Sequence, residues 1–165
     1  MIVILMGVAG SGKTTIGSRL AEKLGWPFFD GDDFHPPENI AKMSSGIALT
    51  DEDRQPWLQA LADLIANLLA NNTSAVLACS ALKSAYRDRL KNGAGTNTDQ
   101  IRFVYLKVSP VVAHERLRKR EGHFMPEGLI SSQFETLEEP GDAIVADASL
   151  TPDEVIAQIK QALKL

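Results

Sequence analysis

The sequence predicts an α/β fold, in which a parallel sheet carries helices on both faces. Short apolar runs alternate with helical patterns along the whole chain, and such alternation is typical of parallel sheets. The first run, residues 2–6, is continuously apolar, as expected of a strand that is covered on both faces. A glycine-rich loop follows it directly. In a sheet of this kind, ligands are expected at the carboxyl ends of the strands.

The N-terminal third begins with this strand and continues with a helix over residues 13–24, which Gly25 closes. Residues 26–29 form a second apolar run that leads into an acidic loop. Between residues 36 and 50 several prolines and a glycine interrupt any longer pattern, so we expect short helical pieces and loops there.

The middle of the chain has a long helical periodicity over residues 51–71, which is clearest from Trp57 onward. Pro56 is expected in the first turn of this helix or at a break before it. Further along, we expect a third strand, a helix, a polar loop and a fourth strand, over residues 75–79, 85–91, 92–99 and 101–108.

The C-terminal third starts with Ser109 and Pro110, which are typical of the N-cap and first position of a helix. This helix is expected to end near residue 120. There follow a loop, a helix, a weak fifth strand and a capping-box start for the last helix, over residues 121–128, 129–138, 143–146 and 151–154.

Length and composition fit one domain over residues 1–165, and 44% of the residues are hydrophobic and 23% charged. The formal net charge of −4 makes nucleic acid a poor partner. Cys79 is the sole cysteine, so no internal disulfide forms and a reducing cytoplasm is expected. No apolar run approaches the roughly 20 residues of a membrane span, so we expect no membrane association.

The glycine-rich loop matches the phosphate-binding pattern G-x-x-x-x-G-K-[ST] between a strand and a helix. Its backbone N–H groups would hold the phosphates of ATP, Lys13 would reach the β- and γ-phosphates, and Thr14 would hold Mg²⁺. No N-K-x-D guanine reader is found and the chain is short for a motor ATPase, so a small kinase is favoured. The expected ATP contacts of this loop are Gly7, Val8, Ala9, Gly10, Ser11, Gly12, Lys13, Thr14 and Thr15.

Two carboxylates, Asp30 and Asp32, follow the second strand and would face the same way in an extended chain. One could support the metal while the other accepts a proton from the incoming hydroxyl. His35, close behind them, is equally compatible with a ligand contact and with a surface turn.

Basic residues provide the cations that anionic substrates require. Lys83 and Arg87 share one face of a predicted helix, as do Arg116 and Arg120. Arg54 follows three acidic residues and could either offset them or bind substrate. A solvated basic face remains the alternative for each pair.

Together these segments resemble the gluconokinases among the P-loop kinases. Beyond the phosphate loop, the resemblance rests on stretches at 30–36, 39–43, 49–58, 79–88, 116–120, 123–125 and 132–138. The most specific are D-G-D-x-x-H at 30–35, D-R-x-P-W-L at 53–58 and C-S-A-L-K-x-x-Y-R-D at 79–88. It weakens after about residue 140.

The resemblance implies a P-loop kinase fold with a five-stranded parallel sheet and a mobile lid, near residues 116–127. It implies direct in-line transfer of phosphate from ATP, with Mg²⁺, to D-gluconate in the cytoplasm, and often a homodimer. By similarity to the related shikimate kinases, Asp32 would be the carboxylate on the hydroxyl side and Asp30 the one on the metal side. With the residues chosen above, the expected site comprises Lys13, Asp32 and Arg120 for catalysis; Arg116 and Arg120 for phosphate; Thr14 and Asp30 for metal; and Asp32, His35, Arg54, Lys83, Arg87 and His123 for substrate.

Two other functions remain open on the sequence. A kinase of the same fold could act on another small acid or on a nucleoside monophosphate. A regulatory module could bind nucleotide without transferring phosphate.

Overall fold

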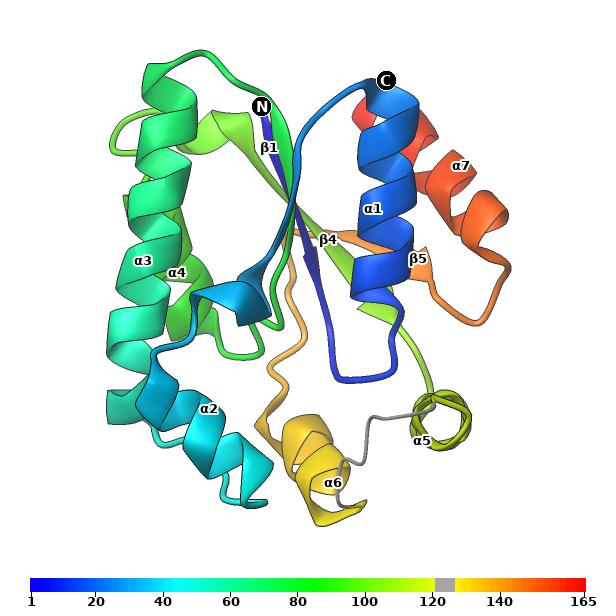
Figure 1. The fold of residues 1–165 in the computed structure, drawn as a ribbon. Helices are drawn as coiled ribbons and strands as arrows, with labels where there is room; N and C mark the ends of the chain where they lie inside the picture. The colour runs from blue at the N-terminus through cyan, green and yellow to red at the C-terminus, as the bar shows by residue number, and fades with distance from the viewer. Residues whose placement is uncertain (121–126) are drawn as a thin grey trace.

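A computed structural model describes residues 1–120 and 127–165 of the chain. Its centre is a five-stranded parallel sheet with the strand order β2-β3-β1-β4-β5 (Figure 1). The strands are β1 (Ile2–Met6), β2 (Phe28–Asp30), β3 (Ala75–Ala78), β4 (Ile101–Lys107) and β5 (Ile144–Asp147). The predicted α/β fold with a parallel sheet is thus confirmed.

Both faces of the sheet are covered, because alternate residues of the central strands enter two different cores. Ile2, Ile4 and Met6 of β1 pack on one side, whereas Val3 and Leu5 pack on the other. The first core lies under α3 (Asp51–Ala70) and α4 (Ser84–Asn92), and the second lies under α1 (Lys13–Leu24) and α7 (Pro152–Leu163) (Figure 1).

The second strand begins two residues later than the sequence suggests. The Trp26 N–H donates to the carbonyl of Ala21, and Gly25 adopts the left-handed conformation that ends α1, so Trp26 still belongs to this helix end. Pro27 has no N–H, and pairing with β3 starts at its carbonyl, which accepts from Val76.

Pro56 neither starts nor breaks a helix, contrary to expectation. It lies inside α3, which begins at Asp51 under a capping box formed by Thr50 and Asp53. At the sixth helical position a proline leaves the carbonyl of Glu52 without its helical donor. Glu52 is exposed, so water satisfies this carbonyl and the helix continues.

The carboxyl ends of the strands all face one end of the molecule, where three shorter helices gather (Figure 1). These are α2 (Pro37–Ser44), α5 (Pro110–Arg118) and α6 (Glu127–Thr136). Two 3₁₀ turns, η1 (Gly31–Phe34) and η2 (Thr98–Gln100), complete the described elements. No helix in residues 1–120 or 127–165 is long and apolar enough to cross a membrane.

Candidate active site

The phosphate loop connects β1 to α1 and is shaped by glycines with positive φ angles. Gly10 has φ +80° and Gly12 has φ +93°. A Cβ on Gly10 would lie 2.6 Å from the carbonyl oxygen of Ala113, so the loop packs tightly against α5. Only glycine permits both this backbone conformation and this close approach.

Lys13 points back along the loop that it belongs to. Its Nζ donates to the carbonyls of Gly7 and Val8 at 2.9 and 3.0 Å. Burial lowers the pKa of Lys13, whereas the nearby charges of Asp32 and Asp30 act in the opposite direction. The ammonium group is therefore held at the loop, beside the two carboxylates that the sequence singles out.

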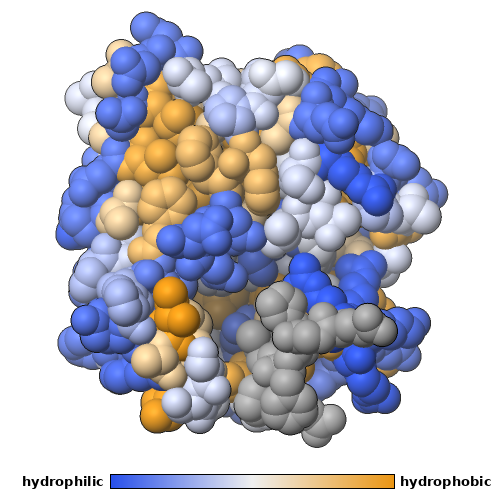
Figure 2. All heavy atoms as spheres, viewed as in Figure 1, coloured by the Kyte–Doolittle hydropathy of each residue, from blue (hydrophilic) through white to orange (hydrophobic). Residues whose placement is uncertain are grey.

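Asp30 and Asp32 are brought together with the loop, but they differ in surroundings. The Asp30 carboxylate accepts from the Thr14 hydroxyl at 2.8 Å and from the backbone N–H of Asp32, two residues later, at 3.1 Å. The Asp32 side chain is 82% exposed. In Figure 2 the acidic η1 turn appears as a hydrophilic area in the middle of the face. One carboxylate is thus joined to the phosphate loop while the other is free to meet a substrate.

His35 lies beside the acidic turn with most of its side chain covered, and its contact with substrate stays a prediction. Its side chain is only 5% exposed and its ring stacks on Trp57, with ring centroids 4.4 Å apart. Nδ1 lies 3.3 Å from Nδ2 of Asn39, and Nε2 lies 4.0 Å from Oδ1 of Asp32. His35 therefore supports Asp32 from behind.

Asn39 fixes the orientation of this histidine. Its Nδ2 donates to the carbonyl of Asp53 at 2.8 Å and has its second hydrogen available for Nδ1 of His35. Burial lowers the pKa of His35, so the ring is neutral near pH 7. An accepting Nδ1 assigns the ring proton to Nε2, the nitrogen that faces Asp32.

A cluster of charges joins the N-terminal ends of α3 and α4. Lys83 Nζ lies 2.9 Å from both carboxylate oxygens of Asp51, which also accepts from the hydroxyl of Tyr86. Arg54 donates to the carbonyl of Leu49 at 2.5 Å and lies over the Tyr86 ring, 5.6 Å from its centroid. Hydrogen bonds from Tyr86 and Lys83 lower the pKa of Asp51. Two of the predicted substrate cations are therefore neighbours.

Arg87 is mostly covered by the loop that precedes its helix. It is 6% exposed, and its Nη1 donates to the carbonyls of Ala81 and Leu82 at 3.0 and 3.1 Å. Ala81 has φ +44°, an unusual conformation for a residue with a side chain. Arg87 therefore ties the β3–α4 loop to α4, and its contact with substrate stays a prediction.

Arg116 and Arg120 come from the end of α5. Arg116 donates through Nη2 to the carbonyl of Ala148 at 2.6 Å, and its Nη1 lies 4.0 Å from where a Cβ on Gly12 would be. Arg120 is exposed, and its charge contributes to lowering the pKa of Lys13, after burial. Both arginines are thus near the loop. His123 and half of the predicted lid, residues 121–126, lie outside the described residues.

The residues present suit a magnesium ion that is held mainly by phosphates. Among the described residues, no group of three or more His, Cys, Asp and Glu side chains could hold a metal by itself. Thr14 and Asp30 offer a hydroxyl and a carboxylate, which are hard oxygen ligands, side by side at the phosphate loop. Mg²⁺ commonly takes one or two such protein ligands together with phosphate oxygens and waters.

Sequence reasoning missed the roles of Gln133 and Asn39. The Oε1 of Gln133, in α6, accepts from the Ala9 N–H of the phosphate loop at 2.7 Å. Asn39 is 3% exposed and orients His35. Both residues lie in segments that carry the family resemblance, and a polar side chain at a buried helical position was the signal that could have identified Asn39.

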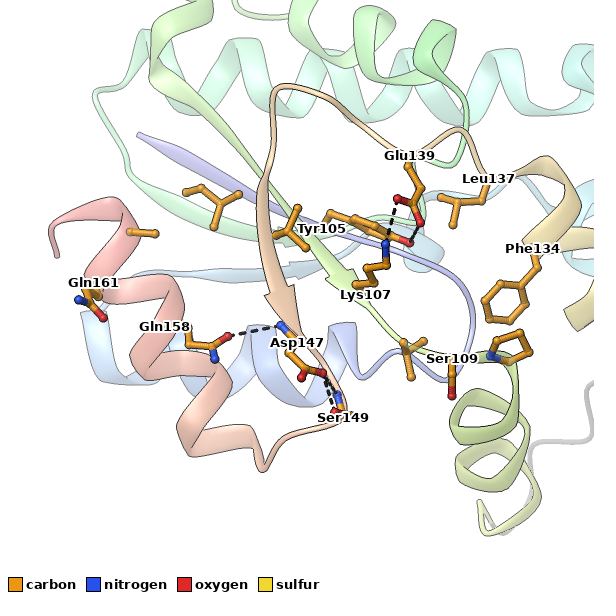
Figure 3. Close-up of a pocket in the computed structure, with 15 residues that line it drawn as sticks. Tyr105, Lys107, Ser109, Phe134, Leu137, Glu139, Asp147, Ser149, Gln158 and Gln161 are labelled. Carbon is orange, nitrogen blue, oxygen red and sulfur yellow. Dashed lines mark hydrogen bonds and ion pairs between the residues drawn. The ribbon is translucent and has the colours of Figure 1, made fainter.

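A pocket of about 1280 Å³ lies away from these groups, beside β4 and β5 (Figure 3). On one wall the Tyr105 hydroxyl and Lys107 Nζ both donate to the carboxylate of Glu139, while Phe134 reaches in from α6 (Figure 3). None of the predicted site residues lines it. The chemistry at the phosphate loop, and not this pocket, therefore defines the candidate active site.

Comparison with known proteins agrees with this geometry. A family model described as shikimate kinase matches residues 9–164. The gluconokinase of Gluconobacter oxydans is 44% identical over 160 residues, which cover 95% of this chain and 88% of that protein. The thermoresistant gluconokinase of Escherichia coli is 42% identical over 167 residues, which cover 99% of this chain and 93% of that protein. The chain belongs to the gluconokinase family.

Solved structures place the fold in the same family. The crystal structure of a gluconokinase from Sinorhizobium meliloti superimposes with a TM-score of 0.86 at 44% identity, covering 98% of this chain and 90% of that one. The shikimate kinase of Aquifex aeolicus, at 19% identity and a TM-score of 0.64, shares the fold. The gluconokinase family therefore uses the P-loop kinase fold that the sequence predicts.

Proposed function

We propose that this protein transfers the γ-phosphoryl group of ATP to D-gluconate and forms 6-phosphogluconate. The observation that carries the proposal is the contact between the acidic turn and the phosphate loop: Asp30 accepts from Thr14 at 2.8 Å, and Asp32, two residues later, is 82% exposed. Curated relatives at 42% and 44% identity are gluconokinases. We further propose that the protein acts in the cytoplasm and associates as a homodimer.

The transfer needs positioning and charge stabilisation more than covalent chemistry. Asp32 would accept the proton of the attacking hydroxyl, while Lys13 and Arg120 would stabilise negative charge on the transferring phosphoryl group. Mg²⁺, held by Thr14 and Asp30, would neutralise charge on the phosphates when it is bound. Exclusion of water by a lid over residues 116–127 would keep ATP from being lost to hydrolysis.

The gluconate carboxylate requires a cation some distance from the hydroxyl that is phosphorylated, because an unpaired buried carboxylate is costly. We propose that Arg54 reads it, with Lys83 beside it. Burial lowers the pKa of His35, Asp32 raises it and Arg54 lowers it, so both charges act on this one ring. Arg54→Lys keeps the charge but loses the two parallel donors. It should raise the KM for gluconate and leave the KM for ATP nearly unchanged.

An ATP-consumption assay with the purified protein tests the function directly. D-gluconate, shikimate, glucose and common nucleoside monophosphates are offered in turn with Mg²⁺. Gluconate should be turned over, and glucose, which has no carboxylate, should be a poor substrate. A preference for shikimate or a nucleotide would identify another kinase of this fold, and nucleotide binding without turnover of any acceptor would point to a regulatory module.

A further inference from the structure

The phosphate loop is contacted by a side chain from the opposite end of the sequence. The Ala9 N–H donates to Oε1 of Gln133 at 2.7 Å, across 124 residues of chain. We propose that Gln133 is a positioning residue: it accepts the Ala9 N–H and so holds the loop in the shape in which the amides that follow Ala9 face the γ-phosphate of the nucleotide. This inference rests on the proposed function, because it assumes that the loop binds ATP.

Gln133 is held firmly enough to position another group. Its neighbours in sequence, Phe134 and Leu137, pack against the core under α1 and α7. Just beyond α6, Glu138 makes two hydrogen bonds to the β3–α4 region. Its N–H donates to the carbonyl of Leu82 at 2.9 Å, and the Glu138 carboxylate accepts from the Ser84 N–H at 2.6 Å. The second half of α6 is therefore anchored both to the core and to the β3–α4 loop.

Ala9 lies at the end of the loop where the γ-phosphate is expected. The amides at the start of α1, after Gly12, are at the other end and suit the β-phosphate. Lys13 is the side chain that reaches the β- and γ-phosphates in such loops. Its Nζ lies on the carbonyls of Gly7 and Val8, directly before Ala9.

A neutral carboxamide suits this position better than a carboxylate would. Oε1 accepts from Ala9, and the Nε2 group of the same amide has two hydrogens to donate. Gln133 can therefore fix the peptide without adding negative charge beside the phosphates. Gly10, the next residue of the loop, packs against the Ala113 carbonyl, so α5 and α6 hold the loop from both sides.

The test compares Gln133→Ala with Glu135→Ala, a matched change at an exposed position of the same helix. Calorimetric titration measures the Kd of each protein for Mg-ADP and for the non-hydrolysable analogue Mg-AMP-PNP. Gln133→Ala should raise the Kd for Mg-AMP-PNP roughly 3- to 10-fold, as expected for one lost hydrogen bond, and leave the Kd for Mg-ADP nearly unchanged. Glu135→Ala should alter neither.

Gln133→Glu is the second variant and covers the case in which Gln133→Ala does not fold. It keeps an acceptor for Ala9 but places a negative charge near the γ-phosphate, so AMP-PNP should bind more weakly than to the wild type while ADP changes less. Equal losses for both nucleotides, or no loss in either variant, would overturn the proposal. If the wild-type protein binds neither nucleotide, it is the proposed function that fails.

Discussion

At the scale of single residues, the two carboxylates of the η1 turn have different surroundings and should have different functions. Asp32→Asn should lower kcat by about 10² to 10⁴ if it removes a general base, with the lower end favoured by a loose transition state. ATP should still bind, because Asp32 has no hydrogen bond to the phosphate loop among the described residues. Steady-state kinetics and nucleotide titration measure both quantities.

Asp30→Asn is the matched comparison, since it changes the carboxylate that accepts from Thr14. It should raise the Mg²⁺ concentration needed for half-maximal rate. If Asp32→Asn instead loses nucleotide affinity and keeps kcat, the two assignments are reversed.

His35 should make the protein less stable as the pH drops below about 6.5, the pKa of an unperturbed histidine. Burial lowers its pKa in the folded state, with Arg54 acting in the same direction and Asp32 against it. The unfolded chain, with a pKa near 6.5, therefore binds more protons below this pH. Stability is fully present above pH 6.5 and falls as the pH drops toward the folded-state pKa.

Melting temperatures of the wild type and His35→Phe, measured from pH 7.5 to 5.0, check this expectation. The phenyl ring keeps the stack on Trp57 but does not titrate, so the variant should lose less stability over the same interval. Parallel curves for the two proteins would contradict it. Asp51 and Asp53 have lowered pKa values, to about 2 for Asp53. These carboxylates therefore change the stability of the protein only in solutions more acidic than this interval.

At the scale of secondary-structure elements, α3 holds the catalytic turn through one buried side chain. Trp57 is 2% exposed, and its Nε1 donates to the carbonyl of Gly31 at 2.7 Å. Trp57→Phe leaves this buried carbonyl without a partner, so the free energy of unfolding should fall by about 1–3 kcal/mol, in addition to lost packing. Since Gly31 precedes Asp32, kcat should fall as well.

Urea unfolding and steady-state kinetics of Trp57→Phe measure these two effects. Trp26→Phe is the control, because Trp26 is half-buried against the other core and no hydrogen bond of its indole is recorded within residues 1–120 and 127–165. A kcat equal to that of the control would mean that α3 does not position the turn.

Elements that owe their form to local patterns were predicted well, because their causes lie within a few residues. The continuous apolar run of β1, the Ser109 cap of α5 and the capping box of α7 are of this kind. Contacts between distant residues were not predictable in this way. The bonds from Asp51 to Lys83 and from Ala9 to Gln133 join residues 32 and 124 positions apart, which only the assembled sheet brings together.

The same limit applies to the surroundings of His35 and Arg87. His35 and Arg87 have polar side chains in segments typical of a substrate site, and sequence gives no measure of their exposure. The fold buries both, the first against Trp57 and the second against the carbonyls of Ala81 and Leu82.

At the scale of the whole molecule, the two proposed substrate sites are connected through α6 and the residues that follow it. Gln133 contacts the phosphate loop, and Glu138 contacts the loop that carries Lys83. Hydrogen exchange of peptides that cover residues 116–127 tests whether this part of the molecule closes over both ligands. Strong protection is expected only with AMP-PNP and gluconate together. Equal protection in the free protein would instead indicate a rigid segment.

Both borders of the sheet are formed by short strands, with three residues in β2 and four in β5. The Asp147 N–H at the β5 border is already donated to Gln158 of α7, at 3.4 Å. Polymerisation by strand addition starts from long, flat, unprotected borders, which are the template of cross-β fibrils. Native copies of this protein offer very little of such a template at either border of the sheet.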